Sequence, residues 1–197
     1  TVNPFEMLDK YGADATRWYL LHTSPAWSPT KFDEDGLIEI TSKFFGTLRN
    51  VYNFFVLYSN QDNIDIGKVF VDYRKRPELD RWILSKYNRL IDDVTEEMNR
   101  YDHMKTVRKI QNFVVEDLSN WYIRRARRRF WAEELTEDKK NVYATTYEIL
   151  VGVAQLMAPF APFISDEIYT DLTGAESVHL SFFPKSDADL IDEKVEE

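Results

Sequence analysis

The chain has 197 residues, of which 44% are hydrophobic and 30% are charged, and it carries a formal net charge of −9. This profile is typical of a folded globular domain and argues against an intrinsically disordered chain. The chain contains no cysteine, which excludes disulfides, thiolate metal sites and cysteine nucleophiles. Its apolar stretches are interrupted by polar residues and prolines, and its start lacks the features of a signal peptide. We therefore expect a cytoplasmic protein without a membrane partner.

Apolar residues recur at steps of three and four along most of the chain, which predicts amphipathic helices. Because these helices are long and joined by short turns, we expect an all-α fold, an antiparallel helical bundle. The acidic tail, residues 186–197, is expected to be flexible and solvated. In chain order, the expected elements are two short helices within residues 1–22 divided at Gly12, a helix at 33–59, one that opens at Pro77, one from His103 to Trp131, one capped by Thr136 and ending near Pro159, one ending at Gly174, and an extended segment at 178–183.

Sequence signatures of catalysis are absent. The glycines form neither a G-x-G-x-x-G pattern nor a P-loop, and no serine lies in a nucleophile elbow. The three histidines are far apart and lack metal-ligand spacing. Acidic pairs such as Glu96 with Glu97 are typical of solvated helix faces. We expect no catalytic residue, no metal site and no cofactor in this chain.

Positive charge is concentrated in the segment NWYIRRARRRFW, residues 120–131. Residues 105–131 carry eight basic and two acidic side chains, a net charge of +6 within an acidic protein. At 100° per residue, Arg125 and Arg128 are predicted to continue the apolar stripe of this helix, with Arg124 beside them. The stripe consists of Val107, Ile110, Val114, Leu118 and Trp121, and a second apolar side consists of Tyr122, Ile123, Ala126 and Phe130.

Two interpretations of this basic helix remain open. The helix end could present guanidinium groups to the phosphates of RNA, with nearby aromatic rings stacking on unpaired bases. Alternatively, the arginines could pair internally with carboxylates, which would favour a helical protein-interaction domain. For Trp121 and Phe130 individually, the bundle core is preferred over base stacking. The carboxylates considered as internal partners are Glu133, Glu134, Asp166 and Glu167.

Several segments together resemble the C-terminal part of a class I aminoacyl-tRNA synthetase, over roughly residues 2–184. They are VNPFEMLDKYGADATRWYLLHTSPAW, DRWILSKYN, NWYIRRARRRFW, LMAPFAPFISDEIY and ESVHLSFFP, in this order. The combination of KFDEDGLIEITSKFFGTLRNVYNFF with WYIRRARRRFW is most similar to the isoleucyl branch. The equivalent domain of a valyl, leucyl or methionyl enzyme is the alternative.

The resemblance implies three segments: a stem-contact region at 1–32 following the catalytic domain, a helical anticodon-binding domain at 33–185, and the acidic tail at 186–197. The HIGH and KMSKS signatures and the editing domain of these enzymes are not in the chain, which is expected to begin just beyond the KMSKS loop and to be inactive alone. ATP and Mg²⁺ would act in the full-length enzyme. The implied partners are tRNA(Ile) and the catalytic and editing domains of the same polypeptide, and no DNA is expected. The expected tRNA-binding residues are Arg124, Arg125, Arg127, Arg128, Arg129, Trp121, Tyr122 and Trp131.

Overall fold

The structure is a computed structural model that describes residues 2–196. Two π-helical segments, η1 (Ile40–Phe45) and η4 (Phe113–Ile123), join neighbouring α-helices into two long continuous helices. Short 3₁₀ turns lie at η2 (Ile66–Lys68), η3 (Tyr73–Lys75), η5 (Val178–Leu180) and η6 (Ala188–Leu190). The α-helices are α1 (Pro4–Tyr11), α2 (Ala13–Thr23), α3 (Glu34–Glu39), α4 (Gly46–Gln61), α5 (Glu78–Asn99), α6 (His103–Asn112), α7 (Arg124–Phe130), α8 (Glu137–Met157), α9 (Pro162–Thr173) and α10 (Glu193–Glu196).

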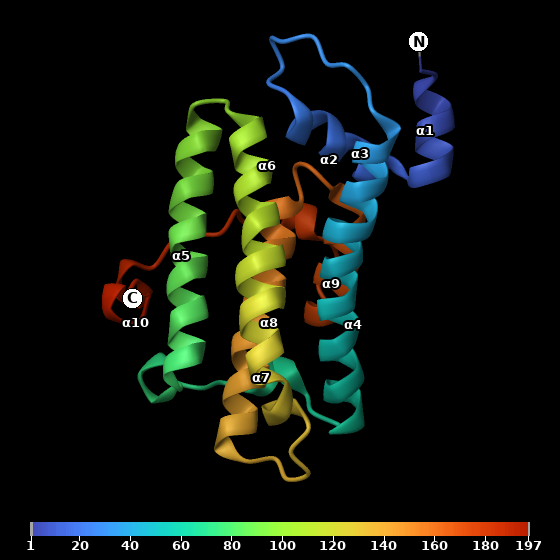
Figure 1. Cartoon of the computed structure of the whole chain (residues 1–197). Coiled ribbons are helices and arrows are strands. Elements are labelled where there is room, and N and C mark those ends of the chain that lie inside the picture. Colours follow the sequence, from blue (N-terminus) through green and yellow to red (C-terminus); the bar gives the residue numbers. More distant parts are fainter. Residues whose placement is uncertain (1, 197) are drawn as a thin grey trace.

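The long helices run up and down beside one another, so the predicted antiparallel bundle is confirmed (Figure 1). The α3–α4 and α6–α7 helices descend, whereas α5 and α8 ascend, and α9 packs closely against α8. The helices α1 and α2 lie at the upper end of the bundle. Its lower end is formed by the end of α7 and by the loops at 62–77 and 131–136.

Local residues explain where several helices begin and end. Asp102 and Thr136 accept hydrogen bonds from main-chain N–H groups in the first turns of α6 and α8, as N-caps do. Gly12 separates α1 from α2 with a φ of 84°, and Gly174 ends α9 with a φ of 69°. Both values lie in a region that glycine tolerates because it has no Cβ. These helix limits agree with the sequence prediction.

The N-terminal segment, predicted to be a stem-contact region, shares its core with the bundle. Trp18 of α2 is fully buried, and its ring stacks on Phe44 with centroids 4.6 Å apart. Its indole N–H donates to Gln111 of α6 at 3.0 Å. The carboxylate of Asp14 accepts a 2.7 Å hydrogen bond from the main-chain N–H of Ile164 and so caps α9 from another helix. The segment therefore packs as part of the bundle.

The segment predicted to be extended, residues 178–183, begins instead with the 3₁₀ turn η5. Asp166 of α9 draws this turn inward, because its Oδ1 accepts hydrogen bonds from Val178 N at 2.8 Å and from Ser177 Oγ at 2.7 Å. Residues 182–187 have no regular secondary structure.

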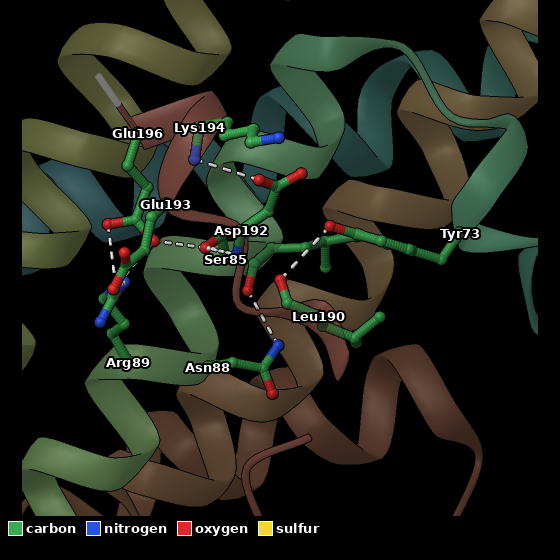
Figure 2. Close-up of polar contacts among 10 residues, drawn as sticks. Tyr73, Ser85, Asn88, Arg89, Leu190, Asp192, Glu193, Lys194 and Glu196 are labelled. Atoms are coloured by element: carbon green, nitrogen blue, oxygen red, sulfur yellow. Dashed lines mark hydrogen bonds and ion pairs between the residues drawn. The ribbon is translucent and has the colours of Figure 1, made fainter. Parts of the chain in front are cut away.

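The described part of the acidic tail, up to Glu196, lies along α5 rather than free in solvent (Figure 2). The main-chain N–H of Asp192 donates to Ser85 Oγ at 2.8 Å, and the Glu196 carboxylate accepts from Arg89 Nε at 2.7 Å. The prediction of a solvated tail missed these partners because they lie about 100 residues earlier in the sequence, on another helix.

Candidate nucleic-acid interface

In the long helix α6–η4–α7, the core-facing positions do not follow the 100° per residue of a regular α-helix. A π-helical segment has more residues per turn, so the buried stripe passes from Leu118 to Tyr122 rather than to Trp121. The prediction that Arg125 and Arg128 continue the core-facing stripe is therefore wrong, and both side chains are exposed. The buried positions in this part of the helix recur at steps of four: Val114, Leu118, Tyr122, Ala126 and Phe130.

Four of the five arginines are exposed, and the helix that carries them, α7, lies at the lower end of the bundle (Figure 1). We call Arg124, Arg125, Arg127 and Arg128 the arginine cluster. Within residues 2–196, none of its members forms an ion pair. The carboxylates considered as internal partners, Glu133, Glu134, Asp166 and Glu167, do not pair with them. The cluster therefore offers its guanidinium groups to solvent.

Arg129 is different, because it forms a bidentate ion pair with Asp80 at the start of α5. The two N–O distances are 2.5 and 2.8 Å, and Asp80 is fully buried. Arg129 also lies 2.9 Å from Asp138. Its expected role in contacting tRNA is corrected by this geometry, since its donors are directed at the buried Asp80 and at Asp138 of the same chain. Arg129 instead fastens α7 to α5 and α8.

Tyr122 is also occupied internally. Its ring is fully buried, and its hydroxyl donates to Asp80 at 2.8 Å. Burial, together with the charge of Asp80, holds the pKa of Tyr122 well above its usual value, so the phenol remains a donor. The expectation that Tyr122 stacks on a base is corrected for this reason: no face of the ring is open.

The two tryptophans of the segment are exposed. Trp121 keeps 46% and Trp131 keeps 53% of its surface accessible, so the preferred core location of Trp121 is wrong, whereas Phe130 is buried as predicted. The guanidinium carbon of Arg125 lies 3.8 Å from the centroid of the Trp121 ring, a cation–π stack. The interface therefore combines free cations with open aromatic faces.

Two buried cations hold the loops beside the arginine cluster. Lys139 Nζ lies 2.6 Å from Asp62 Oδ2 and donates to the carbonyl of Ala132 at 2.5 Å. Arg76 Nη2 lies 2.6 Å from Glu148 Oε1. These contacts connect the loops at 62–77 and 131–136 to α8 and so hold the lower end of the bundle together.

Beside the cluster, a groove of about 720 Å³ lies between α5, η4 and α10. Sequence reasoning missed it because it is assembled from three separate segments. The available signal was Trp82 in the DRWIL segment, whose side chain is half-buried and lines the groove.

The described residues also limit other kinds of site. No helix among residues 2–196 is long and apolar enough to cross a membrane. In the same residues, no three or more potential ligand side chains come together in a way that could hold a metal ion.

An all-α bundle with a basic and aromatic end has the architecture of a helical anticodon-binding domain. The family described as the anticodon-binding domain of tRNA ligase matches residues 80–197, more than half of the chain, and the chain belongs to this family. The matched range begins at the buried Asp80 and includes the acidic tail.

The chain is similar to proteins named isoleucine–tRNA ligase. It is 49% identical to that of Porphyromonas gingivalis over its whole length, which covers 17% of the relative. It is 48% identical to that of Cytophaga hutchinsonii, covering all of this chain and 18% of the relative. It is 43% identical to that of Clostridium tetani, covering 99% of this chain and 19% of the relative. The chain thus spans less than a fifth of the length of these relatives.

A solved structure shows the same fold. It is described as the ternary complex of Agrobacterium radiobacter K84 agnB2 LeuRS with tRNA and LeuAMS. The TM-score is 0.69 at 22% identity, and the match covers 97% of this chain and 22% of that chain. At this identity, the likeness supports the helical architecture alone.

Proposed function

We propose that the chain is the tRNA-binding domain of an isoleucine–tRNA ligase. In this role it positions tRNA(Ile) for charging, in the cytoplasm, by a catalytic domain of the same polypeptide that uses ATP and Mg²⁺. The names of the relatives support the isoleucyl assignment over the valyl, leucyl or methionyl alternative. The observation that carries tRNA binding is the arginine cluster, whose four guanidinium groups are exposed and unpaired within the described residues.

The arrangement suits a phosphate backbone. Arginine binds phosphate oxygens through a planar set of donors, and each phosphate contact releases condensed counterions. The net charge of −9 over the chain limits indiscriminate attraction to polyanions, so binding is confined to the basic end. A protein-interaction domain with internally paired arginines is disfavoured, because within residues 2–196 only Arg129 of the five is paired in this way.

The decisive experiment compares two triple variants. In the first, Arg124, Arg125 and Arg128 are exchanged for glutamine. In the matched control, three exposed basic residues outside η4 and α7 are exchanged: Lys43→Gln, Arg100→Gln and Lys185→Gln. Both variants lose three positive charges.

The affinity for tRNA(Ile) is measured at several salt concentrations. Each lost phosphate contact removes about one unit from the slope of log K against log salt, so the first variant should flatten it by about three units. The control should keep the wild-type slope. If both variants lose affinity and slope equally, binding reflects total charge, and the cluster is not the interface.

Catalysis is assigned to the rest of the parent enzyme. The chain alone should therefore support no isoleucine-dependent exchange of pyrophosphate into ATP. Exchange by the purified chain would contradict the assignment.

A further inference from the structure

Part of the lining of the groove between α5, η4 and α10 is apolar. Leu79 and Trp82 come from α5, Trp121 comes from η4, and Val195 comes from α10. The two tryptophan rings lie 6.1 Å apart between centroids. A volume of about 720 Å³ lies within the range of pockets that hold small organic ligands. The groove can therefore accommodate a planar group against tryptophan.

Arg125 connects this groove to the arginine cluster. It belongs to the cluster, lines the groove and stacks on Trp121 at 3.8 Å. Unpaired RNA bases stack on both aromatic rings and arginine planes. A base could therefore lie on the Arg125 plane, or replace it on the Trp121 ring, while its flanking phosphates remain near the cluster.

The rim of the groove is acidic. Glu116 accepts a hydrogen bond from Asn120 at 3.1 Å, whereas Asp117 has no hydrogen-bond or ion-pair partner within residues 2–196. Burial, helped by Glu116 and Glu196 and opposed by Lys86, raises the pKa of Asp117. The carboxylates on the rim are Glu78, Glu116, Asp117 and Glu196.

This rim selects the chemistry of the ligand. Glu196 is paired with Arg89, whereas Glu78, Glu116 and Asp117 have no cationic partner within residues 2–196. These three carboxylates repel phosphate, so the part of an RNA that enters the groove is a neutral base that supplies hydrogen-bond donors. Guanine presents N1–H and N2–H side by side, which matches the two oxygens of a carboxylate. Adenine and cytosine place one amino group beside an unprotonated ring nitrogen, and uracil flanks its single N–H with two carbonyls. Each of these three bases would direct an acceptor at a carboxylate oxygen.

We propose that the groove binds one unpaired guanine of an RNA whose phosphates are held by the arginine cluster. Asp117 accepts the N1–H and N2–H donors, and the Trp121–Arg125 pair supplies the stacking surface. The inference rests on the proposed function, because the cluster has to bring the RNA to the groove.

The test uses the whole chain and four pentaribonucleotides, UUGUU, UUAUU, UUCUU and UUUUU. All four carry the same number of phosphates, so the arginine cluster contributes equally to each and the ratio of affinities reports the central base. Binding is measured by fluorescence anisotropy at two or more salt concentrations. UUGUU should bind about tenfold more tightly than the others, as expected for one well-formed bidentate base contact.

Two substitutions locate the preference. Asp117→Asn should reduce the preference for UUGUU to less than about twofold while leaving the salt slope unchanged, since no phosphate contact is lost. Trp121→Leu, made separately, should weaken all four RNAs by removing the stacking ring. The matched control is Glu134→Gln, an exposed carboxylate in the loop at 131–136 outside the groove, which should keep the full preference. Thermal melting confirms that each variant is folded.

The outcomes separate the two proposals. Equal, salt-dependent binding of all four RNAs overturns the guanine site but leaves the arginine cluster as an RNA interface. A guanine preference that persists in folded Asp117→Asn places recognition outside the groove and also overturns the inference. If none of the four RNAs binds in a salt-dependent way, the result contradicts the proposed function itself.

Discussion

The buried pair of Asp80 with Arg129 allows a quantitative prediction for Arg129→Gln. Asp80 is fully buried and accepts two hydrogen bonds from the guanidinium group and one from Tyr122. The substitution removes the compensating positive charge and leaves a buried carboxylate with the Tyr122 hydroxyl. Breaking such a pair from one side costs about 3–5 kcal/mol. At about 2–4 °C per kcal/mol for a chain of this size, the melting temperature should fall by roughly 6–20 °C.

The neighbouring Arg128 provides the control, because it is exposed and unpaired within the described residues. Arg128→Gln should change the free energy of unfolding by no more than about 0.5 kcal/mol. Both variants are compared by thermal melting and urea unfolding at neutral pH. Adding Asp80→Asn to Arg129→Gln should restore part of the loss, because the stranded charge is removed.

The effects of the two substitutions on tRNA binding should be the reverse of their effects on stability. Below its melting temperature, Arg129→Gln should keep the wild-type salt slope of tRNA binding, whereas Arg128→Gln should lose about one unit. The reasoning is refuted if Arg129→Gln and Arg128→Gln have the same melting temperature. It is also refuted if Arg129→Gln keeps the wild-type stability but shows a flatter salt slope of tRNA binding.

Two further predictions concern the core and a histidine. In Gly152→Ala, the new methyl group would lie 1.7 Å from the hydroxyl oxygen of the buried Tyr87. This overpacking should lower the free energy of unfolding, measured in urea, by about 1–3 kcal/mol or more. An unchanged urea midpoint would disprove this contact between α5 and α8. Burial, and then the charge of Arg108, lowers the pKa of His22 below 6.5. The unfolded chain therefore binds the proton first as the pH falls, and the free energy of unfolding should decrease as the pH drops below about 6.5. The His22→Gln variant should lack this part of the pH dependence between pH 7.5 and 5.5, and an unchanged profile would show that His22 is not its source.

The sequence by itself determined the helices and their limits, because these depend on nearby residues. Thr136 caps α8 through a hydrogen bond to Lys139 N, three residues later, and Gly12 and Gly174 adopt backbone angles that other residues rarely do. The periodic apolar residues indicated a bundle, and the concentration of arginine in residues 120–131 indicated the basic end. All of these inferences use interactions within one or two helical turns.

Only the tertiary structure decided which side chains of that basic end are free. The π-helical turns of η4 rotate Trp121 and Arg125 out of the core, a shift that a fixed angle of 100° per residue does not include. Arg129 is half-buried and paired, and the sequence does not show this because its partner, Asp80, lies 49 residues away on α5. The docked tail and the groove depend in the same way on segments that meet only after folding. A local pattern specifies which helix forms, whereas the exposure and charge pairing of each side chain depend on the surfaces that the other helices bring against it.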